Sequence, residues 1–217
     1  MVDTASIMQT FSIWLLPLLF AITLHEAAHA WAAFYFGDHT AFLLGRTSLN
    51  PLKHIDPVGT IAIPAVLLLS QTPWVFGWAK PVPINTRNVD NPRTSLALIA
   101  LAGPVANFLM AAMWALVFKL ALLWYNHEVS PASLWLIQTA RIGVIFNIVL
   151  AFFNLLPIPP LDGGKVLSCI LPYSLSSLYD ELEPYGFLLL LALILSGMLG
   201  PIIGPPVVTI SSFLLSL

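Results

Sequence analysis

A His-Glu-x-x-His pattern at residues 25–29 is the part of the sequence with the clearest chemistry. It reads His25-Glu26-Ala27-Ala28-His29 and lies inside a long apolar run. On a helix, residues four apart share one face, so both imidazoles can bind one zinc ion while the intervening Glu acts as general base toward a water molecule. Ionisable side chains inside a membrane-spanning run are costly and mark functional sites. We therefore predict that His25 and His29 bind zinc and that Glu26 is catalytic.

Asp162 is the best candidate for a third zinc ligand. A catalytic zinc holds three protein ligands and one open position. Asp162 follows the proline-rich stretch 157–160 and precedes Gly163-Gly164, so its backbone is stiff on one side and allows close approach on the other. Its carboxylate and that of Glu26 would balance the double positive charge of the ion, which makes burial of the group less costly. The alternative is a loop Asp that caps the following helix.

Composition places these residues in a membrane protein. The chain has 217 residues, of which 59% are hydrophobic and 8% charged, and its mean hydropathy is +0.90, whereas a soluble domain is roughly 25% charged. The net charge of -2 includes no basic tract, so we expect no nucleic-acid partner. The single cysteine, Cys169, excludes an internal disulfide.

Three uninterrupted apolar runs are long enough to cross a bilayer as helices: residues 11–36, 95–125 and 134–156. A fourth run, residues 58–78, is interrupted by glycines and prolines. The last run, residues 185–217, is broken by Gly200-Pro201 and Gly204-Pro205-Pro206, which predicts a kinked helix or a short hairpin.

These runs predict an all-α polytopic membrane protein with about five to six membrane segments, including a three-helix catalytic core and a re-entrant or hairpin segment. We expect one integral-membrane domain over residues 1–217, with the core at about residues 11–170 and C-terminal membrane segments at 184–217.

The distribution of charge predicts the orientation. Most basic residues lie in three connecting segments, whereas residues 126–130 carry none and are flanked by Trp124, Tyr125 and Trp135. The positive-inside rule and the aromatic belt place the N-terminus and the 126–130 loop outside. The same rule places the polar segments on both sides of residues 58–78 in the cytoplasm, which predicts that residues 58–78 re-enter the membrane. The alternative is a true crossing that leaves some basic residues outside. His25 would lie about 16 Å from the cytoplasmic end of its helix, which requires a polar channel from that side.

Taken together and in order, three motifs resemble the site-2 protease family of intramembrane zinc metalloproteases. They are His25-Glu-Ala-Ala-His29, Ala102-Gly-Pro-Val-Ala-Asn107 and Asn154-Leu-Leu-Pro-Ile-Pro-Pro-Leu-Asp162-Gly-Gly. Residues 49–60 and 77–83 resemble a compact prokaryotic branch of that family, without PDZ or CBS domains.

The resemblance implies a three-helix catalytic core, one zinc ion per chain held by His25, His29 and Asp162, and Glu26 as the base. It also implies that the protein cleaves a transmembrane segment of another protein, usually after a first cut by a different protease. We accordingly expect transmembrane protein substrates, a prokaryotic inner-membrane location and an active site toward the cytoplasm. The oligomeric state and the identity of the substrate stay open.

Three polar residues are candidates for substrate binding. Asn154 can donate a hydrogen bond to an oxyanion or to substrate backbone, or can join two helices. Asn107 either contacts substrate or braces helix packing, and His54 either lines the path for water or is a turn histidine. The stretch Lys80–Asn85 can form an edge strand that pairs with an extended substrate.

The competing function is that of a membrane metal carrier in which His25, His29 and Asp162 form a transport site. Carriers are often built from repeated halves, and the sequence has no internal repeat and no second histidine cluster. The two functions differ over Glu26, which a protease needs for catalysis and a carrier does not need for binding zinc.

Overall fold

The computed structural model describes residues 4–63, 66, 70 and 77–217. Within these ranges the chain forms helices and connecting segments and contains no strand, which confirms the predicted all-α class. Residues 64–65, 67–69 and 71–76 belong to the run 58–78, so the prediction that this run re-enters the membrane lies largely outside the described residues.

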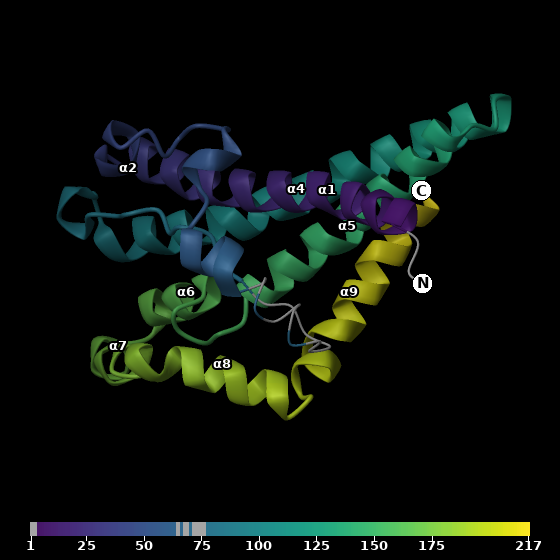
Figure 1. Ribbon diagram of the computed structural model, residues 1–217. Coiled ribbons are helices and arrows are strands. Elements are labelled where there is room, and N and C mark those ends of the chain that lie inside the picture. The colour runs from purple at the N-terminus through teal and green to yellow at the C-terminus, as the bar shows by residue number, and fades with distance from the viewer. Residues whose placement is uncertain (1–3, 64–65, 67–69, 71–76) are drawn as a thin grey trace.

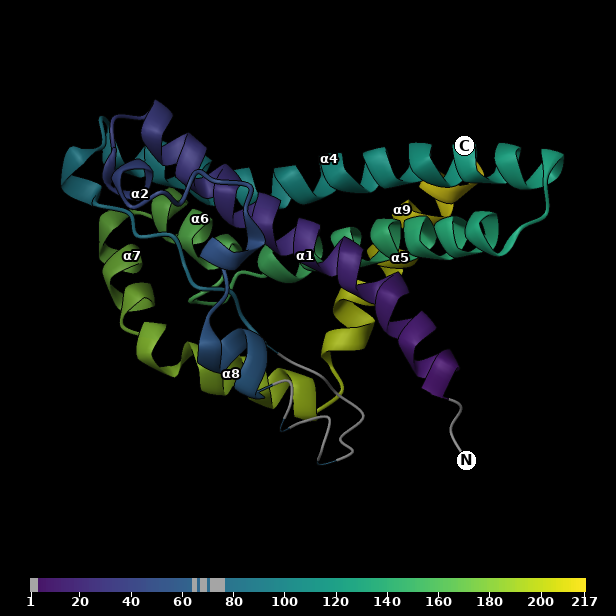
Figure 2. The same ribbon diagram turned by 45° about the horizontal axis from the view of Figure 1, so that its top comes forward.

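Three long helices form the core, as predicted. They are α1 (Thr4–Tyr35), α4 (Pro92–His127) and α5 (Pro131–Asn154). Helices α4 and α5 pack side by side as an antiparallel pair, and α1 packs against both (Figures 1 and 2). The turn between α4 and α5 ends in a capping box in which Ser130 and Ser133 satisfy each other's backbone N–H groups.

Four further helices follow the core, namely α6 (Asp162–Ile170), α7 (Tyr173–Asp180), α8 (Gly186–Leu195) and α9 (Leu199–Ser216). Helix α6 packs against α4, while α9 packs against α5 and α4. Figure 1 shows α9 turning away from α8 to reach the core. Asp162 is therefore brought to the core by a short helix rather than by a membrane span.

The break in the last apolar run is not where the sequence analysis placed it. The chain bends at Gly197, between α8 and α9, where φ is +71° and favours glycine. Gly200-Pro201 lies in the first turn of α9, where a missing N–H costs no hydrogen bond. Pro205 and Pro206 lie inside α9, and the helix continues through them.

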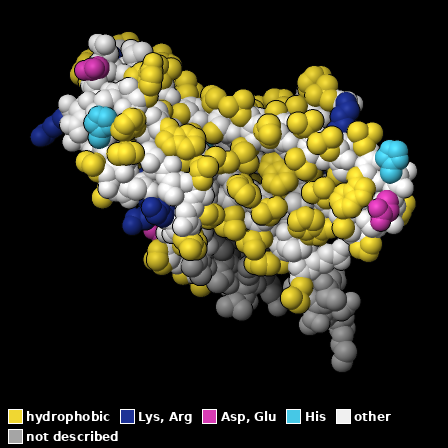
Figure 3. Space-filling model, turned by 90° about the horizontal axis from the view of Figure 1, so that it is seen from above, with side chains coloured by type: hydrophobic (Ala, Val, Ile, Leu, Met, Phe, Trp, Pro, Cys, Tyr) yellow, Lys and Arg dark blue, Asp and Glu magenta, His cyan; other side chains and the backbone are white. Residues whose placement is uncertain are grey.

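Four of the described helices are long and apolar enough to cross a membrane, and they confirm a polytopic membrane protein. They comprise Met8–Tyr35, Pro92–His127, Pro131–Asn154 and Leu199–Ser216. Figure 3 shows hydrophobic side chains over the middle of the molecule, with charged and histidine side chains near its two ends. Helix α8 has 10 residues and is too short to cross by itself, since each residue adds about 1.5 Å.

Short elements connect α1 to α4. They are α2 (Thr40–Leu43), the 3₁₀ turns Pro51–Lys53 and Thr86–Asn88, and the π-helix Pro57–Ala62. Asp38, just beyond α1, has no exposed surface. Its carboxylate accepts hydrogen bonds from Thr40 N (3.0 Å) and Oγ1 (2.5 Å), Asn85 N (2.7 Å) and Asn88 Nδ2 (3.1 Å). Asp38 thereby ties residues 85–88 to the end of α1.

We expect Asp38→Asn to lower stability at neutral pH by about 1–3 kcal/mol, because an amide presents an NH₂ group to donors that now face a carboxylate. Burial raises the pKa of Asp38, but its hydrogen bonds lower it by more, so the folded-state pKa lies below the ordinary value. Its stabilisation is thus complete above the unfolded-state pKa of about 3.9 and is lost as the pH falls through the folded-state pKa. Thermal unfolding of detergent-solubilised protein between about pH 7 and pH 3 should show a shallower acid decline for Asp38→Asn. Parallel declines in both proteins would contradict this assignment.

Candidate metal centre

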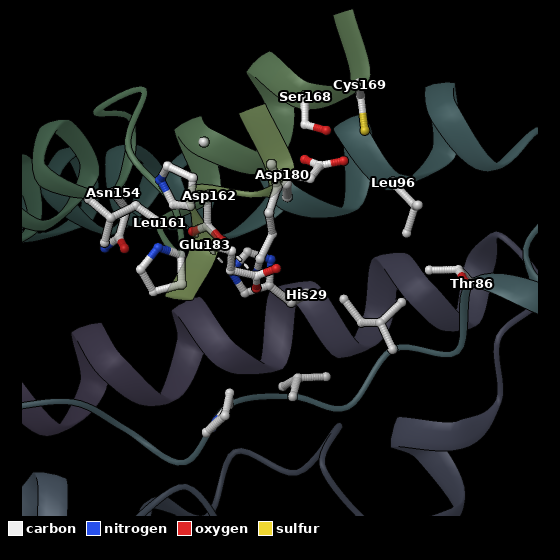
Figure 4. Close-up of a pocket in the computed structure, with 18 of the residues that line it drawn as sticks. His29, Thr86, Leu96, Asn154, Leu161, Asp162, Ser168, Cys169, Asp180 and Glu183 are labelled. Carbon is white, nitrogen blue, oxygen red and sulfur yellow. Dashed lines mark ion pairs between the residues drawn. The ribbon is translucent and has the colours of Figure 1, made fainter. Parts of the chain in front are cut away.

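Side chains from two elements that are far apart in the sequence meet at one buried point. Helix α1 supplies His25 and His29, and the first residue of α6 is Asp162. The two Nε2 atoms are 3.1 Å apart, and they lie 3.2 and 3.3 Å from Asp162 Oδ2. The exposed fractions are 8%, 6% and 5%. Figure 4 shows His29 and Asp162 beside each other in the pocket.

The spacing of these atoms fits a zinc ion. A tetrahedral site with bonds of about 2.0–2.1 Å requires ligand atoms about 3.3 Å apart, close to all three separations. Asp162 Oδ2 is buried and has no hydrogen-bond partner among the described residues, although it faces both imidazoles. Two histidines and one carboxylate are a common donor set of catalytic zinc sites, which keep a fourth position open.

Glycines let the backbone of α6 approach the turn before it. A Cβ on Gly163 would lie 2.2 Å from Leu155 O, and a Cβ on Gly164 would lie 2.7 Å from Pro159 N. Real Cβ atoms do not approach so closely, so larger residues would push the start of α6 away. The close approach expected from the sequence is therefore observed, and it sets the position of Asp162.

Gly103 lets α4 pass directly over the two histidines. A Cβ at this position would lie 2.4 Å from His29 Nε2 and 2.6 Å from His25 Cε1. The Cβ would therefore occupy space used by the ring edges that face Asp162. An α4 residue with a side chain at position 103 cannot pack here without moving one of the two histidines.

Each histidine is also held on the side away from Asp162. His29 Nδ1 lies 2.7 Å from Ile99 O, and His25 Nδ1 lies 2.6 Å from Asn107 Oδ1. A backbone carbonyl can only accept a hydrogen bond, so the Nδ1 of His29 carries the proton. Its Nε2 is then free to bind a metal, as such outer contacts commonly ensure.

Glu26 lies on the cavity wall next to the candidate ligands and is not one of the three. Its Oε2 accepts a hydrogen bond from Val82 N (3.2 Å). The segment around Val82 is held in turn by Arg46, a 6% exposed residue that donates to Lys80 O (2.8 Å) and Pro81 O (3.0 Å). The backbone near Val82 therefore has a defined place beside Glu26.

Residues 77–85 form neither helix nor strand. Pro81 and Pro83 lack N–H groups, and the N–H groups of Lys80, Val82 and Asn85 donate within the chain. Pairing of this segment with an extended substrate stays a prediction.

The candidate metal centre opens into a cavity of about 620 Å³. Helix α1 and residues 81–86 form one wall, and α6 with the end of α7 forms another. In Figure 4, Thr86 and Leu96 lie on one side, and Ser168, Cys169 and Asp180 lie along the other. The three candidate ligands are therefore part of the wall of this cavity.

The structure separates the three residues predicted to bind substrate. Asn154 lines the cavity, and its Nδ2 donates to Leu150 O (3.0 Å). Asn107 has no exposed surface and lies beneath His25. His54 is 2% exposed, and its Nε2 lies 2.8 Å from Ser48 O. Neither Asn107 nor His54 is among the residues that line the cavity.

Two residues connected to the candidate ligands were not predicted from the sequence. Lys165 lines the cavity, with its Nζ 3.7 Å from Asp162 Oδ1. Asn147 is fully buried on α5 and hydrogen-bonded to Asn107. The sequence did contain a signal for Asn147, because polar side chains in the middle of an apolar span usually have a structural or functional role.

Comparison with known proteins gives one family match and several similar proteins. The family model described as "Peptidase family M50" matches residues 123–196, which include Asp162 but not the two histidines. The chain is 38% identical over 183 residues to "Putative zinc metalloprotease YwhC" of Bacillus subtilis (strain 168), covering 84% of this chain and 80% of that protein. It is 30% identical over 181 residues to "Putative zinc metalloprotease Rip2" of Mycolicibacterium smegmatis, covering 83% and 66% respectively. No solved structure matches.

Proposed function

We propose, since the chain belongs to the site-2 protease family (peptidase family M50), that it is a protease of membrane proteins. It would hydrolyse peptide bonds within or near the transmembrane helices of other proteins. The observation that carries the proposal is the triangle of His25 Nε2, His29 Nε2 and Asp162 Oδ2 beside a cavity that also exposes Glu26. One zinc ion per chain would be held by these three ligands.

Within this mechanism Glu26 moves the proton. Zinc, when bound, polarises the scissile carbonyl and makes a water molecule more acidic. The Glu26 carboxylate takes the proton from the attacking water and delivers it to the leaving amine. The hydrogen bond from Val82 N to Oε2 orients that carboxylate while leaving Oε1 for the proton. Asn154, on the wall of the same cavity, supplies an amide for the oxyanion or for substrate backbone.

The substrates we propose are transmembrane segments, because the ligand-bearing helix α1 is itself a candidate span and its active-site residues lie well inside it. The basic connecting segments support an active site toward the cytoplasm. The inner membrane of a prokaryotic cell is the location we propose from the bacterial relatives. A protease binds its peptide in an extended form, so the proposal includes local unwinding of the substrate helix.

Cleavage of transmembrane peptides by the purified protein tests the proposal. The zinc-loaded protein is incubated in detergent with a panel of helix-forming transmembrane peptides, and the products are identified by mass spectrometry. We expect cuts within or near the apolar segments, loss of all cutting after treatment with a chelator, and recovery when zinc is restored. Cutting that persists after zinc has been removed, or no cutting by zinc-loaded protein across the panel, would contradict the proposal.

The same preparation distinguishes the carrier from the protease. Among the residues that the structure describes, one group could hold the ion, namely His25, His29 and Asp162. Transport requires in addition that the ion leave this site. Zinc flux into liposomes that contain the protein, without peptide cleavage, would support the carrier.

A further inference from the structure

A chain of buried hydrogen bonds links His25 to the third core helix. His25 Nδ1 on α1 lies 2.6 Å from Asn107 Oδ1 on α4. Asn107 Nδ2 donates to Asn147 Oδ1 on α5 (3.0 Å), and Asn147 Nδ2 donates to Gly143 O (2.8 Å). Neither asparagine lines the cavity. The two amides can therefore influence the candidate metal centre only through His25, and they do not face the cavity in which a substrate would bind.

Backbone carbonyls at two points determine the direction of this chain. Besides Asn147, Asn107 Nδ2 donates to Ala21 O (3.3 Å). Since a carbonyl oxygen only accepts, the NH₂ end of Asn107 must face Ala21 and its oxygen must face His25. Gly143 O orients Asn147 in the same way. An oxygen beneath His25 requires the proton on Nδ1, which leaves the Nε2 lone pair directed toward Asp162.

Burial makes this arrangement difficult to reverse. Asn107 and Asn147 are both 0% exposed, so bulk water does not reach their amide groups. Flipping either amide would place an NH₂ group against another donor or an oxygen against a carbonyl, which is costly in an apolar interior. The polar pair is thus consistent with a single orientation.

We propose that Asn107, braced by Asn147, is a positioning residue that holds His25 with Nδ1 protonated and Nε2 turned to the metal. This inference rests on the proposed zinc site. It parallels the backbone contact to His29, where Ile99 O performs the same task. The helix geometry supplies a carbonyl at one histidine and a side-chain amide at the other.

The alternative role for Asn107 is to hold helices together, as interhelical amide hydrogen bonds do in membranes. A packing role and a positioning role predict different measurements. Loss of packing lowers the stability of the folded protein, whereas loss of positioning lowers its affinity for zinc even when the protein is folded. Ile148 is a matched packing control, because it neighbours Asn147 on α5 and is also 0% exposed.

The test is a zinc titration of the detergent-solubilised, metal-free protein against a competing chelator, together with its thermal midpoint. Asn107→Leu, which keeps the branched outline of the side chain in a larger volume and has no acceptor, is expected to weaken zinc binding by about 10–100-fold. Asn107→Ser, too short to reach His25, should also bind zinc more weakly and serves if the Leu variant does not fold. Ile148→Ala should lower the thermal midpoint and bind zinc as tightly as the wild type. The visible spectrum of bound Co²⁺ should change in the Asn107 variants alone.

Each outcome decides one question. A folded Asn107 variant with wild-type zinc affinity and an unchanged Co²⁺ spectrum would overturn the positioning role and leave packing. A wild-type protein that binds no zinc would instead overturn the proposed function. A loss of zinc affinity in Ile148→Ala as large as that in Asn107→Leu would show that general loosening of the core explains the effect.

Discussion

Glu26→Gln is expected to reduce peptide hydrolysis by about 10²–10⁴-fold while zinc stays bound. Glutamine keeps the shape of the side chain and an oxygen that can accept the hydrogen bond from Val82 N. It cannot take a proton from water at neutral pH, so the general base is lost. Because Glu26 is not part of the three-ligand group, the zinc content should match that of the wild type. The measurement is the initial rate of cleavage of a transmembrane peptide, with zinc determined on the same sample.

Glu181→Gln provides the matched control, because it is the same chemical change at an exposed residue that does not line the cavity. Its cleavage rate should equal that of the wild type. If Glu26→Gln cleaved as fast as Glu181→Gln with full zinc content, Glu26 would not be the base. If Glu26→Gln had instead lost zinc, its side chain would support the metal site rather than the proton transfer.

Gly103→Ala is expected to disrupt the proposed metal centre, although the substitution adds only a single methyl group. The new Cβ would lie 2.4 Å from His29 Nε2, so either α4 or the imidazole must move. A displacement of about 1 Å at a catalytic group can cost on the order of 10²-fold in rate, and we expect zinc affinity to fall with it. The measurements are zinc content after dialysis and the rate of peptide cleavage.

Gly200→Ala is the control for this prediction. A Cβ at Gly200 would meet nothing within 4 Å, and the residue lies in α9 away from the ligands. Alanine is a better helix former than glycine, so this variant should fold, bind zinc and cleave as the wild type does. Equal zinc content and equal rates in Gly103→Ala and Gly200→Ala would contradict the close contact between α4 and the histidines.

The amino-acid sequence by itself determined the features that depend on neighbouring residues. The spacing of His25, Glu26 and His29 places both imidazoles on one face of any helix, because the period of the helix is a property of the backbone. The length of the three core helices follows from their apolar runs, since a bilayer leaves unpaired backbone groups no partner other than the helix itself. Asp162 was also within reach, because prolines and glycines mark its local backbone.

Only the tertiary structure decided the features that depend on how helices meet. Gly103 and Asn107 lie on the same helix, yet one makes room for His29 and the other holds His25, and this depends on how α4 is rotated against α1. Asn147 is linked to His25 only through Asn107, across the contact between α4 and α5. The bend at Gly197, rather than at the later prolines, likewise reflects where α9 can pack on α5. Local sequence patterns determine which residues lie on one face of a helix. The packing of side chains between helices determines which of those residues contact each other.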